Sequence, residues 1–389
     1  MANPSVEGLK IGKIYNVARC HVAVIEQVSI GLTSPPKYSI TWKTFVLPLI
    51  GIAAFVIYIY VFNVDIQEIL GEVQKIKSSY YVLAIVVSLL DIFLFTLAWR
   101  SLLRFLSVKF PVLKLFAFVW IGIYVDTIIP AESVSGEIAK IYLVNKEQNG
   151  TSGRATASIV AHRLVSMGIT IATLLVGAAL LLVQSLLYGI MLSLILFLIT
   201  MVCLFFVVVV FFSFKEKWTF RMLDGLIRFA ERISRGRWKL TKLRDEVLQT
   251  QKDFHVAVKE YIHAPKTLFT ASLFSSMSWV CALLVYYFTF QAIGYPQIPW
   301  SAILVISAVF VAVKSIPIGV PFEVGLPEIA LTILLQMFGV PVGIGATATI
   351  LSRLLTLWLR FFIGFGAQQW VGIKAIVSGT EQRDYPTVS

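Results

Sequence analysis

The chain has 389 residues, of which 58% are hydrophobic and only 14% are charged. A soluble protein of this length needs a larger share of polar surface, so this composition excludes an ordinary soluble enzyme or binding domain. The net charge of +12 comes from basic residues that gather between apolar segments. Such clustering is typical of cytoplasmic loops facing anionic lipid, so we predict a membrane protein that binds no nucleic acid.

Six apolar segments are long enough to cross a bilayer as helices, since a helical span needs about 20 residues. The predicted spans are 44–62, 80–99, 157–183, 186–214, 267–291 and 342–370.

Two further apolar segments are too short to cross and end at Pro130 and Pro317. Each is followed by a short helical stretch with carboxylates, which ordinary spans avoid. We expect each segment and its successor to enter and leave the membrane on one side, as re-entrant units over 115–144 and 300–338. The predicted fold is therefore an all-α membrane protein with about six full transmembrane helices and two re-entrant broken-helix hairpins.

The distribution of Lys and Arg favours this topology. With both units re-entrant, six spans place both termini in the cytoplasm, together with residues 215–266 and their thirteen basic side chains. The Asn149-Gly150-Thr151 sequon is then cytoplasmic and carries no glycan. The expected organisation is a cytoplasmic arm over 1–43, membrane halves over 44–214 and 267–372, an interfacial segment over 215–266 and a C-terminal tail over 373–389.

The segment 215–266 combines apolar and basic residues at helical spacing. This periodicity predicts a basic amphipathic helix on the cytoplasmic leaflet, and a solvated helical connector is the alternative. The residues concerned are Trp218, Phe220, Leu223, Leu226, Ile227 and Phe229 among Arg221, Arg228, Arg232, Arg235 and Arg237.

An internal repeat relates the two re-entrant units. Residues 130–139 and 321–330 align without a gap, and Ala155–Arg163 matches Ala346–Arg353 farther along. Three full spans lie between the units, which therefore have opposite orientations in the predicted topology. Broken helices related in this way line the substrate site of many transporters. The repeat therefore predicts a polar cavity near mid-depth.

The repeat also supplies the candidate site residues. Arg163 and Arg353 could neutralise carboxylates or bind phosphate, whose geometry matches their forked donors. Glu132 and Glu323 each follow a proline near a helix start, where capping is an equally good explanation. We expect no catalytic motif, metal site or cofactor. The translocation site is predicted to comprise Glu132, Glu137, Arg163, Glu323, Glu328 and Arg353, with Lys314 and Asp126 as weaker candidates and Asp91 and His162 weaker still.

The pattern Gly136-Glu137, followed by His162-Arg163, resembles the membrane domain of the lysylphosphatidylglycerol synthetase family. Gly325-Leu-Pro-Glu328, followed by Arg353, repeats the resemblance, which covers roughly residues 44–372. The family often has Glu-Arg where this chain has His162-Arg163, which leaves the headgroup open. The resemblance implies the flippase portion of aminoacyl-phospholipid synthases, without their soluble synthetic modules, and carries over Glu137, Arg163, Glu328 and Arg353.

We therefore expect a multi-pass protein of the cell membrane that translocates an anionic phospholipid or a polyprenyl-phosphate-linked glycolipid. A separately encoded soluble synthase or glycosyltransferase is a candidate partner. Two alternatives stay open: a membrane enzyme that acts on a lipid phosphate, with a glutamate as general base, and a non-catalytic partner of a lipid synthase.

Overall fold

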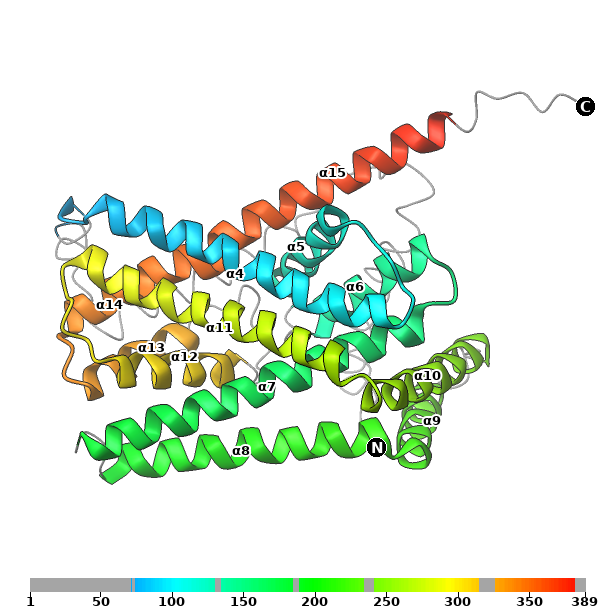
Figure 1. The fold of residues 1–389 in the computed structure, drawn as a ribbon, viewed down its shortest axis with the longest axis horizontal. Helices are drawn as coiled ribbons and strands as arrows, with labels where there is room; N and C mark the ends of the chain where they lie inside the picture. The colour runs from blue at the N-terminus through cyan, green and yellow to red at the C-terminus, as the bar shows by residue number, and fades with distance from the viewer. Residues whose placement is uncertain are drawn as a thin grey trace, which may run out of the picture.

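A computed structural model describes residues 71, 74–129, 134–184, 189–233, 241–314 and 326–381 (Figure 1). The prediction of an all-α protein is confirmed for these residues, which contain no strand. The π-helix η2, Leu354–Leu359, interrupts the last long helix. The α-helices are α4 Ser78–Phe105, α5 Val112–Ile128, α6 Val134–Glu147, α7 Ser152–Val183, α8 Gly189–Phe214, α9 Glu216–Ile233, α10 Thr241–Ile262, α11 Pro265–Ile293, α12 Trp300–Lys314, α13 Leu326–Met337, α14 Val342–Arg353 and α15 Arg360–Glu381.

Five of these helical segments are long and apolar enough to cross a membrane, and each coincides with a predicted span. The chain is therefore a multi-pass membrane protein. The sixth predicted span, 44–62, lies outside the described residues. Helix α15 continues to Glu381, past the expected start of the tail at 373, because no proline follows Trp370 until Pro386. The five segments are Ser78–Phe105, Ser152–Val183, Leu192–Phe214, Pro265–Ile293 and Val342–Val371.

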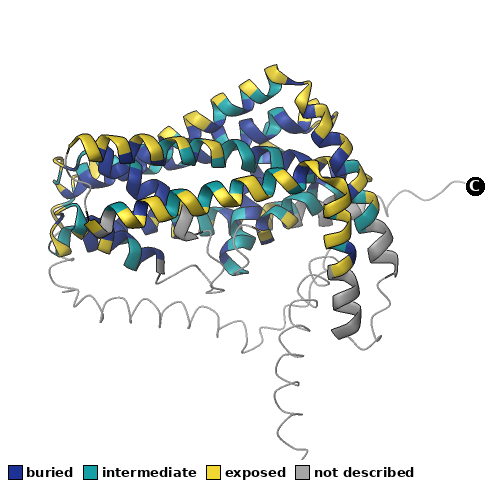
Figure 2. Ribbon diagram, turned by 90° about the horizontal axis from the view of Figure 1, so that it is seen from below, coloured by how far each residue is buried: buried dark blue, intermediate teal, exposed yellow. Residues whose placement is uncertain are grey.

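The long helices pack side by side, with α4 lying along α11 over most of its length (Figure 1). Helix α8 packs on α7 at the periphery, and almost none of its apolar segment is buried, as expected for a helix that faces lipid. Figure 2 shows buried residues between the long helices and exposed residues on their outer faces. The buried apolar residues form one large cluster around α7, α11, α12 and α13 and a second around α4, α5 and α7.

Helices α5 and α6 form a hairpin of two short helices. Their 17 and 14 residues give lengths of about 26 and 21 Å. Gln148 donates to the carbonyl of Lys109 at 2.9 Å, and Lys114 pairs with Glu147 at 2.7 Å. Both contacts join the start of the hairpin to its finish, so the chain enters and leaves it at one end of the bundle.

Helices α12 and α13, of 15 and 12 residues, contact each other and form the second short unit. The connections into α12 and out of α13 lie at the end of the bundle opposite to α9 and α10, whereas those of the α5–α6 hairpin lie at the same end as α9 and α10 (Figure 1). The two units thus connect to the bundle at opposite ends, and their inverted, re-entrant insertion in the membrane stays a prediction.

A close contact between backbones holds α5 and α6 together. A Cβ atom on Gly136 would lie 2.3 Å from the carbonyl oxygen of Gly122. Lipid is as apolar as the side chains, so helices in membranes associate through close packing, which small residues permit. Glycine at position 136 is therefore required by the spacing of the two helices.

The predicted interfacial segment forms two helices, α9 and α10, at one end of the bundle (Figure 1). Helix α10 packs on α7, where Phe254 and Tyr261 meet Leu102 in a buried apolar cluster. On α9 the exposed ring of Trp218 lies under the guanidinium of Arg221. The contact of α9 with the cytoplasmic leaflet stays a prediction.

Candidate functional site

A cavity of about 370 Å³ lies among helices of both membrane halves. Its walls come from α4, α5, α6 and α7 of the first half and from α12, η2 and α15 of the second. Three carboxylates and three cations line it, so the charges balance when all six groups are ionised. These groups are Asp91, Asp126, Glu137, Lys140, Arg163 and Arg360.

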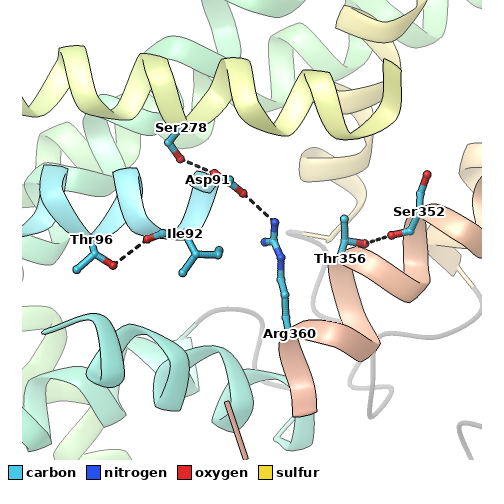
Figure 3. A network of polar contacts seen from close by, with 7 residues as sticks. All are labelled: Asp91, Ile92, Thr96, Ser278, Ser352, Thr356 and Arg360. Carbon is cyan, nitrogen blue, oxygen red and sulfur yellow. Dashed lines mark hydrogen bonds and ion pairs between the residues drawn. The ribbon is translucent and has the colours of Figure 1, made fainter. Parts of the chain in front are cut away.

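One carboxylate of the cavity lies far from both ends of its helix. Asp91 is halfway along α4, and Ser278 is halfway along α11. Ser278 donates to one carboxylate oxygen of Asp91 at 2.5 Å, and Arg360 donates to the other at 2.8 Å (Figure 3). About 20 Å of helix separates Asp91 from either end of α4, which places the group near mid-depth of a span. Charges at that depth are costly unless they are paired or hydrated, and here they are paired.

The α5–α6 hairpin contributes one member of an ion pair to the same cavity. Glu137 lies in the first turn of α6, where a carboxylate also stabilises the helix dipole. Arg163, on α7, donates to Glu137 at 2.8 Å. The two side chains are 26% and 24% exposed, so the pair is open to the cavity.

An equivalent Glu–Arg ion pair, which is almost fully buried, joins α13 to α14. Glu328 lies in the first turn of α13, and Arg353 at the end of α14 donates to it. These side chains are only 5% and 4% exposed, and the guanidinium of Arg353 lies over the ring of Phe310. Neither residue is among those that line the cavity. The expectation that the charges of both repeats share one pocket is therefore corrected, because the second half contributes Arg360 instead.

The π-helix η2 lies between Arg353 and Arg360, the second of which faces the cavity. Residues seven positions apart lie on nearly the same face of an uninterrupted α-helix and about 10 Å apart along its axis. Arg353 and Arg360 have this spacing and bind different carboxylates on different helices. The wider turns of η2 lie between them and rotate the following residues, and π-helical turns are frequent at functional sites. Thr356 and Leu357 of η2 themselves line the cavity.

Asp126 connects the two helices of the first unit. Its carboxylate accepts hydrogen bonds from the backbone N–H of Gly136 at 2.6 Å and from the hydroxyl of Ser135 at 2.7 Å. It therefore satisfies a free amide in the first turn of α6, which a helix cannot pair internally. Glu132 and Glu323 lie outside the described residues, as does the side chain of Lys314, the last residue of α12.

The third cation, Lys140, lies beside aromatic rings. Its ammonium is 5.4 Å from the ring centroid of Phe95 and 5.4 Å from that of Trp99. The ring of His162 also lies beside Phe95, at 4.3 Å between ring centroids, and its Nε2 is 3.2 Å from the hydroxyl of Ser275. His162 is buried within the wall of the cavity.

Sequence reasoning assigns no role to Arg360 or Lys140, two of the six charged groups, and places Asp91 behind Asp126. The signal was present for Asp91 and Arg360, because both lie inside predicted spans, where ionisable residues usually serve a function. Their pairing joins α4 to α15 and could not be seen from spacing along the chain.

Comparisons with known proteins agree with a membrane protein of this kind. The sequence model of the family described as Lysylphosphatidylglycerol synthase TM region matches residues 48–364. A UPF0104 membrane protein of Pyrococcus horikoshii is 22% identical over 333 residues, which cover 83% of this chain and 95% of the relative. Similar proteins occur in Methanothermobacter thermautotrophicus, with 22% identity over 85% of this chain and 96% of the relative, and in Methanocaldococcus jannaschii, with 19% identity over 85% and 95%.

Proposed function

Because the chain belongs to the Lysylphosphatidylglycerol synthase TM region family, we propose that it translocates a phosphate-bearing lipid across the cell membrane. The family description ties the chain to membrane lipids. The substrate is an anionic phospholipid or a polyprenyl-phosphate-linked glycolipid, whose headgroup passes through the charged cavity while its tails stay in the bilayer. Both termini are cytoplasmic in this proposal.

The observation that carries the proposal is the cavity with its six charged side chains. A membrane-embedded cavity of this kind is costly unless its charges are paired or hydrated, so ionisable residues inside spans usually mark a substrate pathway. Its volume of about 370 Å³ is within the range of small-molecule sites. A polar headgroup fits a cavity of this volume, and the acyl chains can remain in the bilayer.

Arg163 is proposed to hold the lipid phosphate. Its guanidinium presents several donors in a plane, which suits the oxygens of a phosphate. In the absence of lipid, Glu137 occupies these donors, and the partial exposure of the pair leaves it accessible from the cavity. Lipid binding would then replace one anionic partner of Arg163 by another.

The two Glu–Arg pairs are proposed to exchange their exposure during transport. In inverted-repeat transporters, the two repeats move against each other around a central site. Here the pair of Glu137 and Arg163 is open to the cavity, and the pair of Glu328 and Arg353 is closed. The opposite state would open the second pair and close the first, so that each repeat faces the headgroup in turn.

The proposal is tested by the movement of a fluorescent phosphatidylglycerol across proteoliposomes that contain the purified full chain. Arg163→Ala should reduce the rate to that of protein-free liposomes. Arg154→Ala is the matched control, since Arg154 is an exposed arginine of the same helix that does not line the cavity. A thermal unfolding midpoint of each variant shows whether it is folded. Wild-type transport by a folded Arg163→Ala protein would refute the role of Arg163.

The same preparation separates translocation from the two other functions. Chemical conversion of the lipid by the purified protein, detected by mass spectrometry, would indicate an enzyme that acts on a lipid phosphate. Transport that appears only after a soluble lipid synthase is added would indicate a membrane partner of that enzyme. Movement of intact lipid by the protein alone is the result expected of a translocase.

A further inference from the structure

We propose that Lys140 is the specificity-determining residue of the cavity and binds the phosphate group of the lipid directly. This inference rests on the proposed function and assigns the recognition of the headgroup to one side chain. The side chain was not among the residues that the internal repeat singles out.

Lys140 differs from the other two cations in its partners. Arg163 is held by Glu137 at 2.8 Å, and Arg360 is held by Asp91 at 2.8 Å. Among the described residues, no carboxylate forms an ion pair with Lys140. Its ammonium group is instead held against the faces of Phe95 and Trp99. Aromatic faces attract a cation without removing its charge, so the charge remains available to an anionic ligand.

The position of Lys140 is fixed before a ligand arrives. Its side chain lies against α5, where a Cβ on Gly122 would lie 3.1 Å from its Cγ. Trp99, one of the two flanking rings, donates its indole N–H to Ser158 at 3.0 Å. A donor that is already in place loses less conformational entropy on binding.

Two carboxylates and one cation act on Lys140 from the walls of the same cavity. Glu137 and Asp126 attract its positive charge, and Arg163 repels it more weakly. A phosphate that binds Lys140 and takes the place of Glu137 on Arg163 would relieve the repulsion between the two cations. The three donors of the ammonium group can reach different phosphate oxygens.

The test measures binding rather than transport, with the purified full chain in detergent. The probes are fluorescent phosphatidylglycerol and fluorescent diacylglycerol, which has the same tails but no phosphate. Lys140→Gln should weaken the binding of phosphatidylglycerol about tenfold, the loss expected when one charge-assisted hydrogen bond is removed. The binding of diacylglycerol should not change. Lys140→Arg, which keeps the charge, should restore most of the affinity.

Lys114→Gln is the matched control, because Lys114 lies on the neighbouring helix α5 and pairs with Glu147 outside the cavity. It should bind both probes like the wild type. Lys140→Met, which keeps the apolar stem, provides a second variant in case Lys140→Gln does not fold. Wild-type affinity for phosphatidylglycerol in either folded variant overturns the inference. An equal loss for both probes also overturns it, since this would show a packing role.

Inorganic phosphate separates the two possible sources of the anion. Competition with phosphatidylglycerol in the wild type, but not in Lys140→Gln, supports recognition of the phosphate group itself. A lack of competition, together with a Lys140 effect on phosphatidylglycerol, supports recognition only within a lipid. A different result would refute the proposed function: the wild-type protein binds lipid through Lys140 but does not move lipid across the membrane.

Discussion

Arg360 donates a hydrogen bond of 2.8 Å to Asp91, although 269 positions separate them along the chain (Figure 3). The contact joins α15, the last helix of the described residues, to α4, and Ser278 of α11 donates to the other oxygen of Asp91. Three helices that are distant in sequence thus meet at one carboxylate in the wall of the cavity.

Loss of one member of this pair should destabilise the protein more than loss of both. Arg360→Met leaves Asp91 without its charged partner, and removing one member of a buried ion pair costs about 3 kcal/mol. The double variant Asp91→Asn with Arg360→Met leaves no unpaired charge and should recover much of that loss. Titration with SDS would measure the free energy of unfolding of the single and the double variants. Equal destabilisation by the single and the double variants would show that the pair itself contributes little.

Gly136→Ala should disrupt the hairpin of α5 and α6. The added Cβ would lie 2.3 Å from the carbonyl oxygen of Gly122 and 2.4 Å from a carboxylate oxygen of Asp126, so the helices must separate. Overpacking of this kind costs about 1–3 kcal/mol. The unfolding transition in SDS should move to lower denaturant. Gly168→Ala is the control, because nothing lies within 4 Å of the Cβ it would add.

The exchange of exposure between the two repeats predicts a difference in cysteine reactivity. Ser166 lines the cavity on the helix of Arg163, whereas Ser352 is buried beside Arg353. In a background without Cys20, Cys203 and Cys281, a water-soluble thiol reagent should label Ser166→Cys rapidly and Ser352→Cys slowly.

Conditions that favour the opposite state should reverse this order. Glu137→Gln, which weakens the first pair, and added phosphatidylglycerol are two ways to shift the equilibrium, and each should raise the labelling of Ser352→Cys. Persistently slow labelling of Ser352→Cys, in a protein that transports lipid, would show that the second pair does not open.

Much of the fold could be predicted from the sequence, because the bilayer imposes a simple length rule. Five predicted spans match helices of the structure, and the two short segments became the short helices α5 and α12. The internal repeat also indicated two Glu–Arg combinations, and both combinations form ion pairs. Repeated residues at repeated spacing predict repeated local contacts.

The sequence could not reveal which charges would share a cavity. Arg353 and Arg360 have helical spacing that predicts a common face, and the π-helical turns between them separate their directions. The bond of Asp91 to Arg360 depends on the packing of α4 against the far end of the chain. Lys140 lies in a short helix with other polar residues. Its contacts with Phe95 and Trp99 on another helix are seen only in the structure.

Acid should weaken the docking of α10 on the bundle, because His255 is buried there. Burial lowers the pKa of His255, Lys259 lowers it further, and Glu216 opposes the shift. Neither ring nitrogen has a hydrogen-bond partner among the described residues, so protonation creates a buried charge that no hydrogen bond stabilises. The contribution of neutral His255 to stability is complete above the unfolded pKa of about 6.5 and is lost as pH falls from there toward the folded value.

Hydrogen exchange of the α10 amides, followed between pH 7 and pH 5 after correction for the intrinsic rates, should therefore report progressively easier opening. The free energy of opening should fall by at most about 1.4 kcal/mol per pH unit within the window. His255→Leu removes the titrating group, so its opening free energy should not depend on pH through this site. His263→Gln is the matched control, because His263 is exposed just beyond α10, and it should keep the wild-type pH dependence. The same pH dependence in His255→Leu as in the wild type would assign the effect to another group.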